Sequence, residues 1–372
     1  MKQGKLHRAL CMVNRQLIIV AMATLVSCAH KTIDTPEQVM QVLNTYCSSS
    51  QILFGQHDAT VYGYTWRDIP GRCDVQEITG DYPAIISFDL GKIELGSDTQ
   101  IDDVPQTSMQ REIVAQYERG GLVSLSWHPW NPLTGGNSWD ISYGNVIAQI
   151  LPDSAQHQLL VDYLDHIADF MLSLRNKNGE LIPVIFRPWH EHTGFWFWWG
   201  APHCTAEEYI ALWHFTYTYL QDKGLTNLVW AFSPNLGADY ATYMERYPGD
   251  EYVDLLGFDV YDFDTNPKET YIEGLHSSLQ VLQQVGEERH KPIALTETGL
   301  EGLTRPEWYT ESLLPVIEQY PIAYLLVWRN ARPEDKANHF YAPYKGHASE
   351  ASFLEFYEDP KIDFCKDIQY KN

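Results

Sequence analysis

Positive charge is scarce in this chain of 372 residues, which carries 26 Lys and Arg against 49 Asp and Glu, a formal net charge of −23. A field of that sign repels the phosphates of nucleic acids and the surfaces of anionic membranes. The composition therefore argues against nucleic acid and anionic membranes as partners, and it favours a neutral or cationic substrate. With 44% hydrophobic residues, the chain can still bury a sizeable core.

Several motifs of cofactor, metal and nucleophile chemistry are also missing. There is no GxGxxG or GxxxxGKS/T loop for dinucleotides or phosphates, and no GxSxG turn that would present a serine nucleophile. The sequence His190-Glu191-His192 lacks the HExxH spacing that places two histidines on one helix face. It also ends a predicted strand, where adjacent side chains point to opposite faces. We therefore expect no catalytic metal and no organic cofactor.

Cysteine is sparse, with six in the chain, of which Cys11 and Cys28 lie near the N-terminus. The other four, Cys47, Cys73, Cys204 and Cys365, are too widely separated for the close pairs of a zinc site. An exported chain could oxidise these four thiols. Two outcomes stay open, a Cys47–Cys73 disulfide or buried free thiols.

The N-terminus has the pattern of a targeting segment. A basic region with Lys2, Lys5, Arg8 and Arg15 precedes the apolar run 17–26, which is too short to span a bilayer comfortably. Leu25-Val-Ser-Cys28 resembles a bacterial lipobox, in which the cysteine is lipidated and becomes the mature N-terminus. We expect a signal peptide over 1–27, lipidation of Cys28 and a tether over 28–36. The protein would then be exported and lipid-anchored, on the periplasmic side or the cell surface of an outer membrane, with this anchor as its only membrane contact.

The remaining chain, 37–372, has no Pro/Ser linker, low-complexity tract, charge block or repeat, and it fits one domain. Near-continuous apolar runs, typical of parallel strands buried on both faces, alternate with segments of helical spacing. Eight such runs predict a closed (β/α)₈ barrel rather than an open doubly wound sheet. The runs are Gln51–His57, Ala84–Leu90, Gly121–His128, Ile182–Glu191, Asn227–Asn235, Val253–Asp262, Pro292–Gly299 and Ile322–Asn330. The clearest helical segments are Met109–Arg119, His157–Arg175, Thr205–Gln221, Glu269–Gly286 and Pro306–Gln319.

Polar and aromatic side chains gather where each apolar run ends. In a (β/α)₈ barrel these ends face one rim, on which active sites are built. One such residue could merely terminate a strand, but eight strands ending this way indicate a site. The residues are His57-Asp58, Asp89, His128, His190-Glu191, Asn235, Asp259 and Tyr261, Glu297, and Trp328-Arg329.

Two of these residues, Glu191 and Glu297, supply what glycoside hydrolysis needs. That reaction uses one carboxylic acid to protonate the leaving oxygen and a second carboxylate to attack the anomeric carbon or to activate water. Glu191 ends the fourth run and Glu297 the seventh. Those strands lie nearly opposite in a ring of eight, so the two carboxylates can face one bond from both sides.

The segments around the two glutamates resemble a known family. RPWHEHTGFWFWWG, which contains Glu191, is similar to the acid/base motif of glycoside hydrolase family 26, and LTETG, which contains Glu297, to its nucleophile strand. SWH, GFDVYD and VWRN extend the similarity over roughly residues 50–335. The resemblance implies that 37–372 is a (β/α)₈ catalytic domain that cuts β-1,4-mannosidic linkages in mannan, galactomannan or manno-oligosaccharides with retention of configuration. Glu191 would be the acid/base and Glu297 the nucleophile that forms a covalent glycosyl-enzyme. Many relatives have Met-Asn after His-Glu, whereas this chain has His192-Thr193, which bears on subsite details.

The resemblance also implies that His128, His190 and Trp196 contact the sugar. Among the other strand ends, Trp328 offers a flat apolar face to a sugar ring and Arg329 offers fixed hydrogen-bond donors. The predicted substrate-binding residues are, in full, His128, His190, Trp196, Asp259, Tyr261, Trp328 and Arg329, with Tyr261 also expected to orient Glu297.

Two other functions stay open. A β-1,3-xylanase or mixed-linkage β-glucanase of the same family would differ in subsite shape, and a glycan-binding barrel without catalysis would need neither carboxylate. The segment Asn131–Tyr143 could close one end of the cleft, which would favour short products such as mannobiose.

Overall fold

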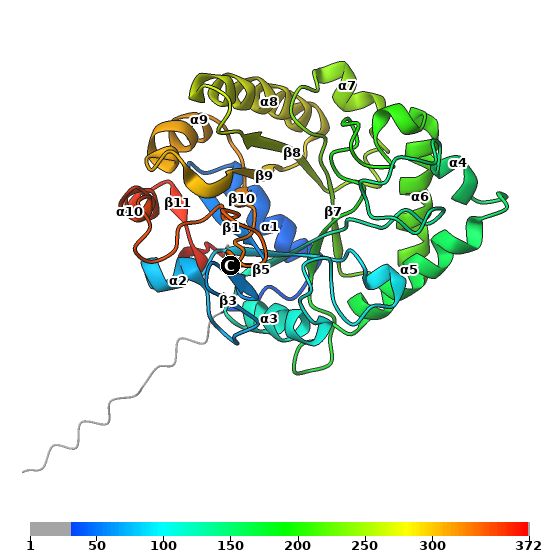
Figure 1. The fold of residues 1–372 in the computed structure, drawn as a ribbon, viewed down its shortest axis with the longest axis horizontal. Coiled ribbons are helices and arrows are strands. Elements are labelled where there is room, and N and C mark those ends of the chain that lie inside the picture. The colour runs from blue at the N-terminus through cyan, green and yellow to red at the C-terminus, as the bar shows by residue number, and fades with distance from the viewer. Residues whose placement is uncertain (1–30, 371–372) are drawn as a thin grey trace, which may run out of the picture. The chain divides into compact units, whose positions relative to one another are not determined.

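The computed structural model describes residues 31–370, and the predicted signal peptide and the lipidation site Cys28 lie outside these residues. A ring of eight parallel strands forms its centre, with helices around it (Figure 1). The strand order is β1-β4-β5-β6-β7-β8-β9-β10, and pairing of β10 with β1 closes the ring. The predicted (β/α)₈ barrel is thereby confirmed. The barrel strands are β1 (Ile52–His57), β4 (Ile85–Asp89), β5 (Leu122–Ser126), β6 (Val184–Arg187), β7 (Leu228–Phe232), β8 (Leu255–Asp262), β9 (Ile293–Leu300) and β10 (Tyr324–Val327).

The described residues form three shorter strands outside the ring. β2 (Tyr62–Gly63) and β3 (Trp66–Arg67) form an antiparallel hairpin, and β11 (Ile362–Asp363) adds to β1. The α-helices are α1 (Pro36–Cys47), α2 (Asp74–Thr79), α3 (Gln106–Glu118), α4 (Ile147–Ile150), α5 (His157–Leu172), α6 (Ala206–Asp222), α7 (Tyr240–Glu245), α8 (Lys268–Arg289), α9 (Leu314–Ile317) and α10 (Glu350–Glu358). Within residues 31–370, no helix combines the length and apolarity needed to cross a membrane.

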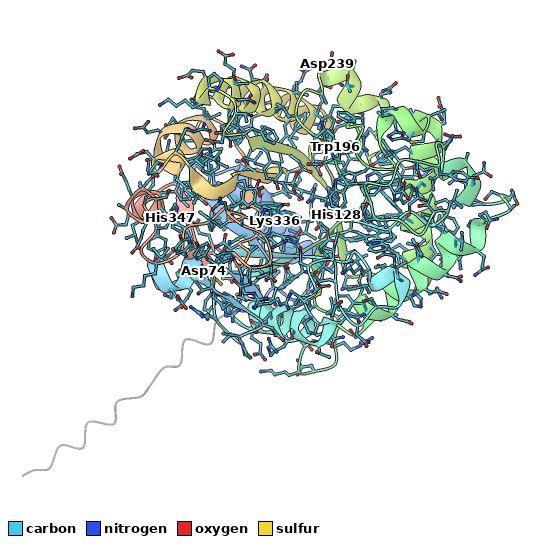
Figure 2. All side chains as sticks on the ribbon, viewed as in Figure 1. Asp74, His128, Trp196, Asp239, Lys336 and His347 are labelled. Atoms are coloured by element: carbon cyan, nitrogen blue, oxygen red, sulfur yellow. The ribbon has the colours of Figure 1, made fainter. Side chains whose placement is uncertain are left out.

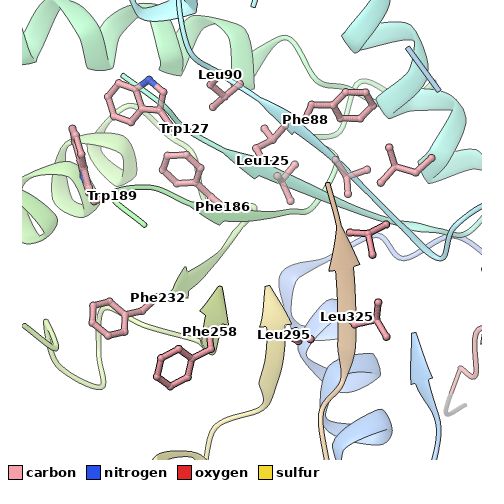
Figure 3. Packing of buried hydrophobic residues seen from close by; sticks show 14 of the residues in the cluster. Phe88, Leu90, Leu125, Trp127, Phe186, Trp189, Phe232, Phe258, Leu295 and Leu325 are labelled. Atoms are coloured by element: carbon pink, nitrogen blue, oxygen red, sulfur yellow. The ribbon is translucent and has the colours of Figure 1, made fainter. Parts of the chain in front are cut away.

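Alternate residues of each strand enter two separate apolar layers. Leu53, Ile85 and Ile185 belong to a cluster inside the barrel, which α1 also joins through Val42 and Leu43. Helix α1 therefore packs at the N-terminal ends of the strands. Their strand neighbours point outward and pack under the surrounding helices, as Figure 3 shows for Phe88, Leu125, Phe186, Phe232, Phe258, Leu295 and Leu325. This period of two places Arg187 inside the barrel, because it lies two residues after Ile185.

Helix α1 begins with a favourable N-terminal cap. The Thr35 side chain accepts a hydrogen bond from the Gln38 amide, and Pro36 occupies the first turn, where a missing N–H costs nothing.

The predicted helix Pro306–Gln319 is instead divided into a π-helical turn, Tyr309–Leu313, and the short α9. Pro315 has no N–H to donate back to Glu311, so the regular α-helical ladder cannot run through this segment.

The four cysteines of the described chain, Cys47, Cys73, Cys204 and Cys365, are free thiols, so the alternative of a Cys47–Cys73 disulfide is wrong; three of them are buried as predicted and Cys47 is partly buried. Cys47 contacts the backbone of Ile293 rather than another thiol.

Candidate active site

A cleft of about 740 Å³ opens at the C-terminal ends of the barrel strands. Figure 2 places His128, Trp196 and Lys336 toward the middle of the ring and Asp239 near its edge. Residues from several strand ends line the cleft, as the barrel architecture predicts. Of the predicted residues, the lining includes His128, Glu191, Trp196, Asp259, Tyr261, Glu297, Trp328 and Arg329.

Glu297 owes its inward direction to a β-bulge. The pairing of β8 with β9 shifts register, so that Phe258 faces Leu295 while the next residue, Asp259, faces Glu297. The extra residue is Thr296, whose hydroxyl donates to Asp259 Oδ1 at 2.7 Å. Simple alternation from Ala294 would direct Glu297 outward, whereas the bulge allows both Thr296 and Glu297 to face the barrel interior.

The Glu297 carboxylate is buried and held at both oxygens. Arg187 pairs with Oε1, and the Tyr261 hydroxyl donates to Oε2 at 2.6 Å. Arg187 also binds Asp259 Oδ2 at 2.7 Å. A guanidinium and a phenol both donate hydrogen bonds, so these contacts fix the orientation of the Glu297 side chain. The predicted orienting role of Tyr261 agrees with this contact.

Glu191 approaches the same cleft from a strained loop. Strand β6 ends at Arg187, earlier than predicted, and both Trp189 and Glu191 have φ near +51°, which is unusual for residues with side chains. The Glu191 amide donates to the Ser233 carbonyl at 2.8 Å, and the Trp196 indole donates to its carboxylate at 2.7 Å. Strand β7 and the Trp-rich segment therefore hold this loop in place.

The environment of Glu191 favours its protonated form. Burial raises the pKa of its carboxyl group well above the usual value, and the negative charges of Asp259 and Glu297 raise it further. Facing oxygens of Glu191, Asp259 and Glu297 all lie within 4.8 Å of one another. These three groups suit a proton donor beside a carboxylate better than a metal site, because Arg187 already pairs with Asp259 and Glu297.

Asp259 lines the cleft but uses both carboxylate oxygens within the protein, for Thr296 and for Arg187. Of the predicted binding residues, it is therefore placed to hold Arg187 against Glu297 rather than to bind sugar.

The side chains of His128 and His190 contact each other, with His128 lining the cleft and His190 behind it. His128 Nδ1 contacts Asp89 Oδ2 at 2.6 Å, and its Nε2 lies 3.1 Å from His190 Nε2. Burial alone would lower the pKa of His128, but Asp89 raises it overall, whereas burial and Arg187 lower the pKa of His190. The two rings therefore differ in their tendency to bind a proton, with Asp89 favouring the protonated form of His128 and burial the neutral form of His190.

The structure differs from the prediction for His190. It is buried and absent from the cleft lining, because its ring lies against His128 and its carbonyl accepts from the Trp199 indole. The His190 ring packs against the ring of His128 and so helps to hold in place a residue that does line the cleft.

Trp328 and Arg329 occupy another wall of the cleft. The Trp328 ring stacks on His57, with ring centroids 4.0 Å apart and an interplanar angle of 6°. Arg329 pairs with Asp102, which lies in the loop between β4 and α3. Arg187 and Asp102 were not among the predicted site residues. The sequence does contain a signal for Arg187, which begins the motif RPWHEHTGFWFWWG and lies two residues after the inward-facing Ile185. No local sequence pattern indicates a role for Asp102.

A closed parallel barrel whose cleft brings two glutamate carboxyl groups face to face has the architecture and chemistry of a glycoside hydrolase. Residues 29–291 match the profile of glycosyl hydrolase family 26, which is most of the chain. The chain belongs to this family.

Individual relatives agree with this assignment. A family 26 β-mannanase structure from Bacteroides ovatus shares 47% identity and superposes with a TM-score of 0.86, covering 91% of this chain and 98% of that one. A mannan endo-1,4-β-mannosidase from Bifidobacterium adolescentis is 32% identical over 86% of this chain, which spans only 34% of that protein's length. One from Bacillus subtilis is 31% identical over 264 residues, 68% of either chain.

Proposed function

We propose that this protein is a retaining glycoside hydrolase that cleaves β-1,4-mannosidic linkages in mannan, galactomannan or manno-oligosaccharides. The observation that carries the proposal is the approach of Glu191 and Glu297, whose oxygens lie within 4.8 Å across the cleft. Retaining enzymes hold the two carboxyl groups about 5–5.5 Å apart, whereas inverting enzymes need about 6.5–9.5 Å to admit a water molecule. The relatives support the substrate, since they are named as mannanases.

The contacts of each carboxyl group suit one step of the reaction. Protonated Glu191 donates its proton to the glycosidic oxygen while Glu297 attacks the anomeric carbon, and a covalent glycosyl-enzyme forms. Esterification removes the negative charge of Glu297. Since that charge raises the pKa of Glu191, its loss allows Glu191 to remain ionised, and the carboxylate can then accept a proton from the water that hydrolyses the intermediate.

The test of this function is hydrolysis of galactomannan, β-1,3-xylan and lichenan, followed by reducing-end release, with the anomeric configuration of early products read by NMR. We expect activity on galactomannan and β-configured first products. Activity confined to β-1,3-xylan or lichenan would assign a different family substrate. If the wild type hydrolyses none of the three glycans, a glycan-binding barrel without catalysis is favoured. First products of α configuration would exclude a retaining mechanism.

We further propose that one end of the cleft is closed, so that short products such as mannobiose are released. Two loops support this. Trp139 of the segment 131–143 lines the cleft and stacks near His128, with centroids 5.5 Å apart, and Asp102 of the β4–α3 loop pairs with Arg329. We expect mannobiose as the main product from the first minutes of digestion of linear mannan, measured by anion-exchange chromatography. An early ladder of long oligosaccharides would contradict the closed end.

We also propose that the protein is exported and anchored through lipidated Cys28, on the periplasmic side or the surface of an outer membrane. The basic region, the apolar run and Leu25-Val-Ser-Cys28 support this. In a bacterial host, wild type should incorporate labelled palmitate and sediment with membranes, whereas Cys28→Ala should do neither. Cys47→Ala, which changes the thiol at the end of helix α1, should behave like wild type. Palmitate incorporation by Cys28→Ala would refute the site.

A further inference from the structure

Three side chains that the proposed hydrolysis does not use as acid, base or nucleophile converge beside the cleft. His57 and Asp58 lie at the end of β1, and Asp102 lies in the β4–α3 loop. A nitrogen of His57 and one oxygen of each aspartate all lie within 4.8 Å of one another. Three ligand types that bind divalent cations therefore share one small region.

His57 and Asp58 are fully buried yet lack hydrogen bonds at the atoms that face each other. Within residues 31–370, neither ring nitrogen of His57 nor Oδ1 of Asp58 has a hydrogen-bond partner. His57 Nε2 lies 3.8 Å from Asp58 Oδ1, which is too long for a hydrogen bond. It is close to the roughly 3.4 Å that separates two ligands placed about 2.1 Å from one tetrahedral ion.

The charges of the cluster also favour the binding of a cation. Asp58 and Asp102 contribute two carboxylates, and Arg329 pairs with Asp102. In the described part of the chain, Asp58 Oδ2 accepts a hydrogen bond from the neutral amide of Gln100 alone, at 2.9 Å. Among residues 31–370, Asp58 forms no ion pair with a lysine or arginine, and a buried carboxyl group in that position either stays neutral or coordinates a metal.

We propose that His57, Asp58 and Asp102 bind one divalent cation of the Zn²⁺ type, with water completing its coordination. One imidazole nitrogen with two carboxylate oxygens is a donor set for Zn²⁺, whereas Ca²⁺ takes oxygen ligands alone. The ion is structural. It ties the end of β1 to the β4–α3 loop and fixes His57, on which Trp328 stacks at 4.0 Å. A wall of the cleft is thereby held in place.

Calorimetric titration of the untagged full chain with Zn²⁺ tests this site, which does not depend on the proposed hydrolysis. We expect one tight site in the wild type and an affinity at least about 100-fold lower in His57→Gln and Asp58→Asn. The double variant Glu191→Gln/Glu297→Gln should bind Zn²⁺ like wild type, which separates this cluster from the carboxylates of the cleft. That variant also keeps the test valid if no glycan is cleaved.

Thermal unfolding supplies a second readout. Zn²⁺ at about 100 times its Kd should raise the Tm of wild type by roughly 3–6 °C, and Ca²⁺ should not. Asp102→Asn should abolish the shift while leaving the buried His57–Asp58 pair intact, which guards against variants that fail to fold. Anomalous scattering at the zinc edge should place the ion between the three residues. No tight binding, equal binding by all variants, or loss of binding in the Glu191→Gln/Glu297→Gln variant would overturn the proposal.

Discussion

Replacing Glu297 by alanine should lower kcat/KM for galactomannan by about 10⁴- to 10⁶-fold, since removing a nucleophile leaves only binding and the remaining electrostatic contacts. The change also leaves buried Arg187 with one carboxylate partner instead of two. The smaller alanine opens a space at the anomeric carbon into which azide can enter. With a dinitrophenyl β-mannobioside, azide should restore turnover and give the α-configured mannobiosyl azide, because it attacks from the side that Glu297 occupies.

A glutamate on the outside of the barrel provides the matched control for this substitution. Glu311 is exposed and pairs with Lys268, so Glu311→Ala should keep kcat/KM within about twofold of wild type. Initial rates and mass spectrometry of the azide product give the measurement. More than one per cent of wild-type activity in Glu297→Ala, or a β-configured azide, would mean that another group is the nucleophile.

Replacing Glu191 by alanine should lower kcat on galactomannan by about 10²- to 10⁴-fold, the usual contribution of a general acid. A dinitrophenolate leaves without protonation, so formation of the glycosyl-enzyme from a dinitrophenyl mannobioside should be nearly unaffected. Hydrolysis of the glycosyl-enzyme should become rate-limiting, because Glu191 is also the base that activates the water. Azide should then accelerate turnover and give the β-configured product, opposite to the outcome for Glu297→Ala.

The pH dependence gives an independent test of the acid. The protonated form of Glu191 is the active one, so kcat/KM of the wild type should fall as the pH rises through the pKa of this group. Burial and the neighbouring charges raise that pKa, so the fall should occur at a pH above the ordinary glutamate range near about 4.3. Trp196 donates to the ionised carboxylate and lowers the pKa, so Trp196→Phe should move the fall to a higher pH. If kcat/KM of Trp196→Phe decreases at the same pH as that of the wild type, or if Glu191→Ala still shows the decrease, the titrating group is not Glu191.

The strands of the barrel were predictable because each one is a local pattern. Seven of the eight predicted runs contain a barrel strand and the eighth ends one residue before β9 does, since continuous apolar sequence is what a strand buried on both faces requires. Of the helices that were not predicted, α2 (Asp74–Thr79) and α7 (Tyr240–Glu245) are short and depend on packing. The division of the segment Pro306–Gln319 depends on one proline in an otherwise helical pattern.

The sequence by itself determined the barrel, the eight strand ends that build its rim, and the two glutamates among them, because all of these are encoded in short stretches of chain. The tertiary structure alone decided which way the side chains face. The bulge at Thr296 directs Glu297 inward, the left-handed backbone of Glu191 brings its carboxyl group to the same cleft, and Arg187 joins Glu297 to Asp259. His190 lies behind His128, and Asp102 approaches His57 and Arg329. These contacts join residues far apart in the chain, and their geometry exists only once the ring of strands has closed.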